Sequence, residues 1–251
     1  MFAPDPSFLA IAAPAVVFAG ISKGGFGSGA AFASAAILAL VIAPGQAIGI
    51  MLPLLMLIDA ATLKPYWKRW NTGDAWILLS GALPGVALGA AFYRAADPDH
   101  LRLLIGAIAV LFVLWQIAAR AGRLPIASRP LPRWGGALAG LVAGFTSFVA
   151  HAGGPAAAVY LLSKRPAKTE FQATTVIVFW ATNVFKALPY GMLGIFTLET
   201  LLIDLWLAPF ALLGTWLGVK AHYAIPERAF FALTYVLLTI TGSKLIWDGL
   251  T

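Results

Sequence analysis

The stretch Ser22-Lys23-Gly24-Gly25-Phe26-Gly27-Ser28-Gly29 interrupts an apolar run that otherwise extends over residues 7–43. Four glycines in six positions release the backbone from a regular helix. Lipid tolerates irregular backbone only where it is buried in protein or faces a cavity. This stretch therefore predicts a broken helix inside a membrane, with its free amides turned towards a cavity.

A second break, Thr146-Ser147-Phe148-Val149-Ala150-His151-Ala152-Gly153-Gly154-Pro155, divides residues 132–163. As helices, the pieces 30–43 and 155–163 would be about 21 Å and about 14 Å long, which is short for a hydrocarbon core of about 30 Å. We therefore predict two broken helical hairpins, each entering and leaving on one side of the membrane. Two short spans in each region remain the alternative.

The composition requires a lipid environment. Of 251 residues, 61% are hydrophobic and 11% are charged, and the mean hydropathy is +0.87, whereas a soluble domain has about 25% charged residues. A soluble enzyme, a disordered chain and a disulfide scaffold are excluded, and the absence of cysteine removes thiolate chemistry. The net charge of +7 does not indicate nucleic acid, because the basic residues lie in short gaps between apolar runs.

The remaining apolar runs predict full-length spans, and the basic residues give them an orientation. Lysine and arginine gather in loops 64–73, 120–133, 163–169 and 220–228, which are therefore predicted to be cytoplasmic, with both termini outside. Asp204 and Lys244 lie near span ends and are expected to be solvated. The predicted spans are 45–63, 74–93, 100–120, 168–188, 199–220 and 227–248.

An internal repeat organises these elements. A shift of 124 residues aligns Gly20 with Gly144, Gly29 with Gly153, Asp59 with Asn183, and Pro65-Tyr66 with Pro189-Tyr190; Gly85 and Gly89 match Gly214 and Gly218 at a slightly larger offset. Each half has an odd number of crossings, so the second copy is inverted. We predict an all-α integral membrane protein of two inverted repeats, each a broken hairpin plus three spanning helices. The first repeat covers 1–120, the cytoplasmic linker 121–133 and the second repeat 134–251.

Ionisable residues inside the membrane are costly and indicate function. Lys23 lies in the first break beside a predicted half-helix N-terminus, which favours an anion. His151 lies in the second break and is a candidate ligand or proton carrier. Asp59 is expected to pair with Lys23 or to gate the inner mouth, while Lys186 either lines the site or reaches the outer surface.

The sequence resembles the TauE/SafE family of sulfite and sulfonate exporters. The resemblance rests on Lys23-Gly24-Gly25-Phe26-Gly27-Ser28-Gly29, on His151-Ala152-Gly153-Gly154-Pro155 and on the stretch from Asn183 to Pro189-Tyr190, and it extends over essentially the whole chain. It implies movement of small sulfur-containing anions, sulfite or sulfonates such as sulfoacetate, across the inner membrane of bacteria.

We therefore predict a secondary transporter that exports a small oxyanion by alternating access around a site between the two breaks. It is not expected to be an enzyme or to bind a cofactor, a metal or nucleic acid; proton coupling and a homodimer are open. An anion channel is the main alternative, and an enzyme acting on lipid phosphates a remote one. The predicted substrate-binding residues are Ser22, Lys23, Gly24, Gly25, Gly27, Ser28, Thr146, Ser147, His151, Gly153 and Gly154, with Asp59, Asn183 and Lys186 in coupling or gating.

Overall fold

The computed structural model describes residues 5–26, 30–121, 130–224 and 227–251, and every regular element in these ranges is a helix. The first half contains α1 (Pro6–Ile21), the π-helix η1 (Ser22–Phe26), α2 (Phe32–Leu38), α3 (Pro44–Leu63), α4 (Thr72–Ala95) and α5 (Pro98–Arg120). The second half contains α6 (Arg133–Ala150), α7 (Gly154–Ser163), α8 (Lys168–Met192), α9 (Leu198–Ala224) and α10 (Glu227–Leu250).

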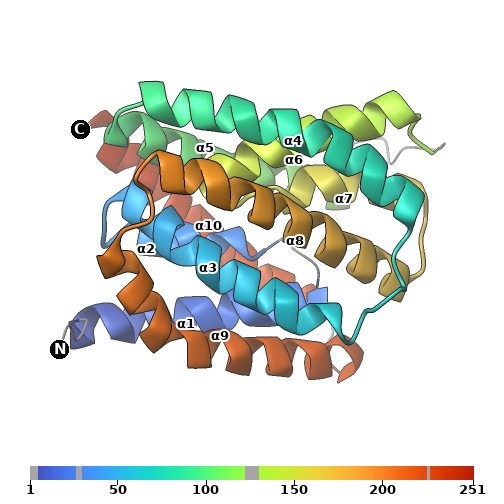
Figure 1. Cartoon of the computed structure of the whole chain (residues 1–251), viewed down its shortest axis with the longest axis horizontal. Coiled ribbons are helices and arrows are strands. Elements are labelled where there is room, and N and C mark those ends of the chain that lie inside the picture. The colour runs from blue at the N-terminus through green and yellow to red at the C-terminus, as the bar shows by residue number, and fades with distance from the viewer. Residues whose placement is uncertain (1–4, 27–29, 122–129, 225–226) are drawn as a thin grey trace.

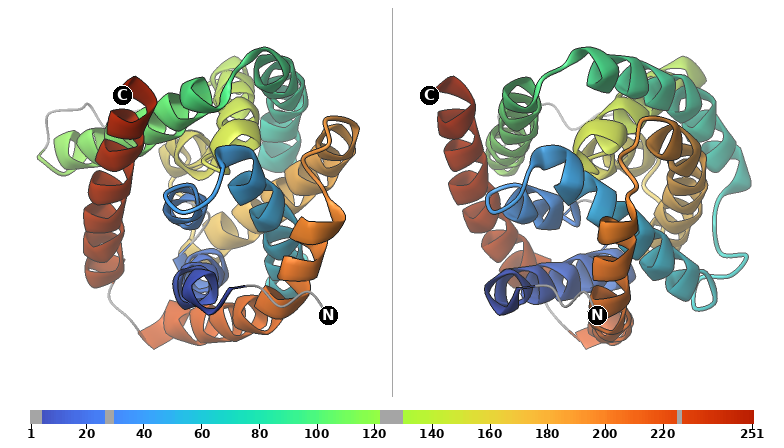
Figure 2. Two further views of the ribbon diagram at one scale, coloured as in Figure 1. Left: turned by 90° about the vertical axis from the view of Figure 1, so that its left-hand side faces the viewer. Right: turned by 60° about the vertical axis from the view of Figure 1, so that its left-hand side comes forward.

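Helices such as α3, α4 and α8 run along the long axis of the bundle, whereas α5 and α10 lie obliquely to it (Figures 1 and 2). The two ends of the chain lie at the same end of the bundle (Figure 1). This end is called the terminus end below. α1 runs away from it and α2 returns towards it, whereas α6 and α7 form a hairpin that opens at the opposite end (Figure 1). The two broken regions are therefore helical hairpins of opposite direction, and whether they are re-entrant in the membrane stays a prediction.

Each hairpin packs against a long helix of the other half. α1 packs along α9, and α6 packs along α4. The outer helices α5 and α10 lie side by side (Figure 2), and α3 packs against α8. These are the contacts that two interlocked inverted copies would make, since α1 corresponds to α6, and α4 corresponds to α9. The inverted relation of the halves, and their boundaries, stay a prediction that this arrangement supports.

Glycines set the spacing in these helix pairs. A Cβ atom added to Gly81 of α4 would lie 1.8 Å from the Ala137 carbonyl oxygen of α6, and one added to Gly140 of α6 would lie 2.1 Å from the Leu78 carbonyl oxygen of α4. Gly20 of α1 and Gly214 of α9 approach the facing backbone in the same way. Lipid supplies no hydrophobic drive between helices, so such close backbone contact is what holds them together.

The variant Gly81→Ala is expected to destabilise the protein, because the added methyl group meets backbone that cannot turn aside. Overpacking of this kind costs about 1–3 kcal/mol, which corresponds to a fall in melting temperature on the order of 5 °C. Gly191→Ala is the matched control: nothing lies within 4 Å of the added atom, and alanine is the better helix former. Thermal unfolding in detergent measures both; equal melting temperatures would contradict the assigned role of Gly81.

The predicted spans correspond to α3, α4, α5, α8, α9 and α10. By length and composition, the described segments apolar enough to cross a membrane are Pro6–Phe26, Pro44–Leu63, Thr72–Ala95, Pro98–Ala119 and Leu198–His222. α8 is long enough but more polar, because it carries a buried row of amide, hydroxyl and ammonium groups. α2 is shorter than predicted, since helical structure ends at Leu38 and a turn leads to Pro44.

Candidate functional site

Helical structure does not end where the glycines of the first break begin. Residues Ser22–Phe26 continue α1 as a π-helix, whose wider turn alters the backbone hydrogen-bond pattern. Side chains from other elements bond to three carbonyl groups in this turn. Gln172 Nε2 donates to Lys23 O at 2.6 Å, Tyr66 OH donates to Gly24 O at 2.8 Å, and His222 Nδ1 lies 2.7 Å from Gly25 O.

The glycines of this turn face α9. An added Cβ atom would lie 2.8 Å from the Thr215 carbonyl oxygen at Gly24 and 2.4 Å from the Gly218 carbonyl oxygen at Gly25. Their small size therefore serves close packing of the turn on α9. This differs from the expectation that they line the anion site.

The second break ends α6 at His151, which has a left-handed backbone with φ of +54°. The N–H groups of His151 and Ala152 donate to the carbonyl groups of Ser147 and Thr146 and close the helix end. The Thr146 hydroxyl donates to Val142 O at 2.8 Å and to Ala152 O at 3.1 Å. This turn points the His151 ring back into the protein, where the residue is 7% exposed.

Lys23 and Asp59 form a buried ion pair at the centre of the bundle. Lys23 Nζ lies 2.6 Å from Asp59 Oδ1, and both residues are buried. Asn183 Nδ2 donates to the other carboxylate oxygen at 2.7 Å. The carboxylate of Asp59 is therefore balanced by one cation and one amide, which is what a charge needs inside a protein.

Lys186 is a second buried cation, and it bonds to neutral groups. Its ammonium lies 2.9 Å from Ser147 O, 3.0 Å from Ser147 Oγ and 2.9 Å from His151 Nδ1. The prediction that it could reach the outer surface is wrong, because its exposed fraction is 0%. Among the described residues, no carboxylate forms a salt bridge with it.

The contacts of His151 fix its hydrogen position. The ammonium of Lys186 has only donors, so Nδ1 accepts from it. The carbonyl oxygen of Ile48 lies 2.9 Å from Nε2 and only accepts, so Nε2 carries the hydrogen. The ring is therefore neutral in this arrangement. With both lysines protonated and Asp59 ionised, the side chains of Lys23, Asp59, Lys186 and His151 carry one net positive charge.

A small cavity lies among these side chains. Its volume is about 10 Å³, and Lys23, Ser147, His151 and Asn183 line it together with Ala31, Leu55 and Phe179. A space of this size holds about one water molecule. We call it the central cavity. Both breaks contribute to its wall.

Equivalent positions of the predicted repeat meet around the central cavity. Asp59 and Asn183, which are 124 positions apart, bond to each other. Tyr66 OH donates to Gly24 O, and Tyr190 OH donates to Phe148 O at 2.5 Å, so both partners of this second bond are shifted by the same 124 positions. The pair Asp59–Asn183 is where a two-fold axis relating the halves would pass.

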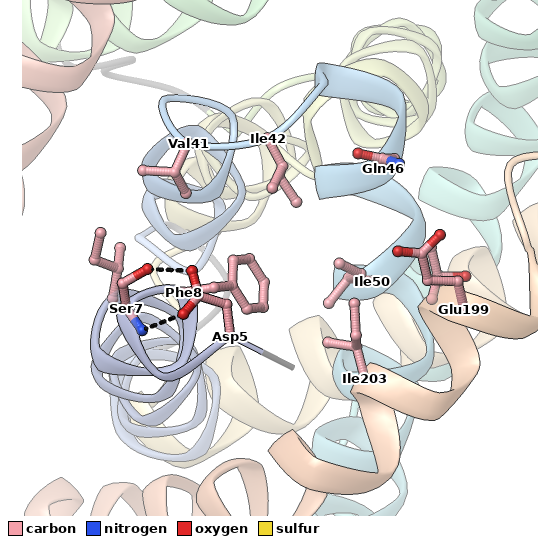
Figure 3. A pocket seen from close by; sticks show the side chains of 11 residues that line it. Asp5, Ser7, Phe8, Val41, Ile42, Gln46, Ile50, Glu199 and Ile203 are labelled. Atoms are coloured by element: carbon pink, nitrogen blue, oxygen red, sulfur yellow. Dashed lines mark hydrogen bonds between the residues drawn. The ribbon is translucent and has the colours of Figure 1, made fainter. Parts of the chain in front are cut away.

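A pocket of about 410 Å³ opens at the terminus end, between α1, α3 and α9 (Figure 3). After the predicted orientation, we call it the outer pocket and the pocket described next the inner pocket. Two acidic side chains, Asp5 and Glu199, lie on the wall of the outer pocket, and Ile50 and Ile203 are among its apolar residues. The Ser7 hydroxyl and the Ser7 amide both donate to the Asp5 carboxylate, and these hydrogen bonds hold the pKa of Asp5 below its usual value. This pocket therefore carries negative charge.

An inner pocket of about 400 Å³ lies between the first break and the start of α7. Its wall includes Gly25, Gly154 and Gln172, together with the cationic Lys168, whose ammonium donates to His222 O at 2.7 Å. Gln172 also bonds to the backbone of Lys23, which lines the central cavity. One side chain thus lies between the inner pocket and the buried charges.

The structure brings together six of the predicted site residues and separates the others. Lys23, Ser147, His151 and Asn183 line the central cavity, and Asp59 and Lys186 bond to them. Gly153 packs against Ala143 and Phe179, and Gly154 lines the inner pocket. Ser22 is buried away from the cavity, and Gly27 and Ser28 lie outside the described residues.

Sequence reasoning gave no role to Gln172, Tyr66 or His222, the side chains that hold the first break. Tyr66 carried a usable signal, because the repeat matches it with Tyr190. Asp204 was expected to be solvated, and this is wrong, since it is 7% exposed and both carboxyl oxygens are shielded. Lys244 is exposed and bonds to Asp248, as its place near a helix end suggested.

The comparison with protein families agrees with this architecture. The family model described as "Sulfite exporter TauE/SafE" matches residues 12–245, nearly the whole chain. No curated protein and no solved structure gives a significant match. The members of this family are transporters and not enzymes. The chain therefore belongs to the TauE/SafE family of sulfite exporters, as a multi-pass membrane transporter.

Proposed function

We propose that the protein exports a small sulfur-containing oxyanion, sulfite or an organosulfonate, by alternating access around the central cavity. The observation that carries this proposal is the buried positive charge of Lys186, which no carboxylate balances in the described part of the chain. A monoanion would bring the cluster of Lys23, Asp59, Lys186 and His151 to neutrality.

The unbalanced positive charge of Lys186 would attract an anion to the central cavity. A charge at the bilayer centre costs at least about 2.5–3.5 kcal/mol on insertion scales, so an unbalanced charge at this depth indicates a function. The proposed ligands of the anion are the ammonium groups of Lys23 and Lys186, the Ser147 hydroxyl and the Asn183 amide. All four groups can donate hydrogen bonds to an oxyanion.

Alternating access is supported by the distribution of space. The central cavity, at about 10 Å³, is too small for an oxyanion, whereas pockets of about 400 Å³ and about 410 Å³ lie on the inner and outer sides. This arrangement of one small and two large spaces supports the proposal that the central cavity is occluded between the two pockets. The repeats over 1–120 and 134–251 are the proposed moving bodies, since binding sites of such transporters lie at the repeat interface.

Charge and potential favour export. Lys168 lies on the inner pocket, and Asp5 and Glu199 lie on the outer one. In the predicted orientation, an anion would be attracted on the cytoplasmic side and repelled from re-entry outside. A membrane potential, inside negative, adds about 2.3 kcal/mol per charge per 100 mV in the outward direction.

His151 orients Lys186 in this occluded state, because its two ring nitrogens bond to Lys186 and to Ile48 O. The predicted role of His151 as a proton carrier stays a proposal. A protonated ring could not accept from Lys186, so proton uptake would release the ammonium towards the cavity. Such release would strengthen anion binding.

Flux into proteoliposomes tests the proposal. Purified full-length protein is reconstituted, and uptake of sulfite, sulfoacetate, taurine and thiosulfate is compared with that of protein-free vesicles. We expect uptake of at least one anion to saturate and to be accelerated by the same anion trapped inside, which is the signature of a carrier. Non-saturating flux without counterflow, or single-channel currents, would indicate a channel instead and overturn alternating access.

A further inference from the structure

Asp204 is a buried carboxyl group that the central site does not use. It lies in the seventh position of α9, in the part of this helix nearest the terminus end (Figure 1). The residue is 7% exposed, and both carboxyl oxygens are shielded from solvent. Neither oxygen has a hydrogen-bond partner among the residues that the structure describes.

The surroundings of Asp204 are apolar. It lies in a groove of about 390 Å³ between α3 and α9, and we call this the α3–α9 groove. Among the described residues that line the groove, Asp204 alone can titrate. The other lining residues are Pro53, Leu54, Leu57, Leu198, Leu201, Leu202, Leu205 and Ala208.

The elements packed against α9 supply no cation to this carboxyl group. The sequence of α1 contains no titratable side chain, and the only one in α3, Asp59, is paired with Lys23 of η1. On α9 itself, the nearest charged residue is Glu199, which lines the outer pocket. A carboxylate ion shielded as Asp204 is would therefore lack water, a counter-ion and a hydrogen-bond donor at once.

We propose that Asp204 is a proton-binding site of the transporter, and that the α3–α9 groove closes around it only when the carboxyl group is protonated. The neutral acid can be covered by leucine side chains, whereas the carboxylate requires water. The proton is taken up from water at the terminus end when the groove opens. It is released again as a proton when the groove next opens, and no covalent bond other than O–H forms or breaks.

Helix α3 links this site to the central cavity. Pro53, Leu54 and Leu57 of α3 form one wall of the groove, while Leu55 and Asp59 of the same helix face the central cavity. A change in the packing of α3 on α9 therefore moves residues of both sites. This coupling of the proton to the anion rests on the proposed transport function, whereas proton binding by Asp204 does not.

Infrared difference spectroscopy tests proton binding without transport. Purified full-length protein at neutral pH is expected to show the C=O stretching band of a protonated carboxyl group, and Asp204→Asn is expected to lose it. Asp99→Asn is the matched control, because the carboxylate of Asp99 is exposed and has no place in the proposed transport path; it should keep the band. Thermal unfolding verifies that both variants fold. A wild-type spectrum without this band, or a band that survives in Asp204→Asn, would overturn the proposal.

Flux under a proton gradient tests the coupling. Sulfoacetate is the probe, because near neutral pH its sulfonate and its carboxylate both stay ionised, so that this anion, unlike sulfite, carries no titrating proton of its own. We expect the pH on the side of the terminus end to change the flux of the wild type and of Asp99→Asn, and this response to be lost in Asp204→Asn, with counterflow retained. If Asp204→Asn kept the full response, the coupling role would be refuted. If neither the wild type nor any variant moved sulfoacetate, the transport proposal would fail for this anion. The infrared spectra would still decide whether Asp204 binds a proton.

Discussion

Replacing Lys186 with methionine is expected to raise the anion concentration for half-maximal flux by about 10- to 100-fold, which is the loss of one charge-assisted hydrogen bond worth about 1.5–3 kcal/mol. Methionine keeps the length and apolar stem of the side chain but removes the charge that Asp59 does not balance. In the same proteoliposome assay, Lys244→Met is the matched control. Lys244 lies on a spanning helix, is exposed and bonds to Asp248.

Stability separates this effect from misfolding. The variant removes a buried charge but leaves the Ser147 carbonyl and His151 Nδ1 without their donor, so its melting temperature is expected to stay near that of the wild type. Lys186→Arg keeps the charge and should retain more of the affinity than Lys186→Met. Wild-type affinity in Lys186→Met would remove the observation on which the proposed function depends.

Replacing Lys23 with methionine is expected to be the most damaging single change for stability. It leaves the carboxylate of Asp59 fully buried with only the Asn183 amide as a partner. Removing one partner of a buried ion pair costs about 3–5 kcal/mol, since the remaining charge is uncompensated. The same carboxylate would also repel an incoming anion, so flux should fall as well. Thermal unfolding and sulfoacetate uptake measure the two effects.

The double variant Lys23→Met with Asp59→Leu provides the control for this prediction. It removes both charges of the pair and leaves the net positive charge of Lys186, so most of the lost stability should return. Uptake should also recover in part, because Lys186 remains to bind the anion. If Lys23→Met moved sulfite and sulfonates as fast as the wild type, the assignment of the site to the two breaks would be wrong.

The sequence predicted the helices well because lipid imposes strict lengths on apolar segments. The six predicted spans lie on six helices, and the short piece 155–163 matches α7, which covers Gly154–Ser163. The opposite directions of the two hairpins agree with the predicted inversion of the second half. The π-helix was not predictable, because Gly24 and Gly25 are compatible both with an open loop and with close packing on α9.

The ionisable residues of the site were predictable from the sequence. Lys23, Asp59, His151 and Lys186 were singled out because ionisable groups in apolar runs are costly, and they meet at the centre. The pair of Lys23 with Asp59 was one of the two expectations for Asp59, and it is confirmed. The bonds of Lys186 to Ser147 and His151 were not predictable, since they depend on how the helices pack. The roles of Gln172 and His222 depend on the same packing, because each bonds to a carbonyl group far away in the sequence.

The hydrogen bond between Asn183 and Asp59 joins matching positions of the predicted two halves. A molecule with two identical halves would place two carboxyl groups, or two amides, face to face at this point. Two carboxylates at such a distance cannot both be ionised. An amide at Asn183 in place of a second carboxylate therefore avoids this repulsion and leaves one negative charge, that of Asp59, on the axis. A duplicated, symmetric ancestor would have no preferred direction for its cargo, and this one-atom difference at the axis is where such a preference could begin.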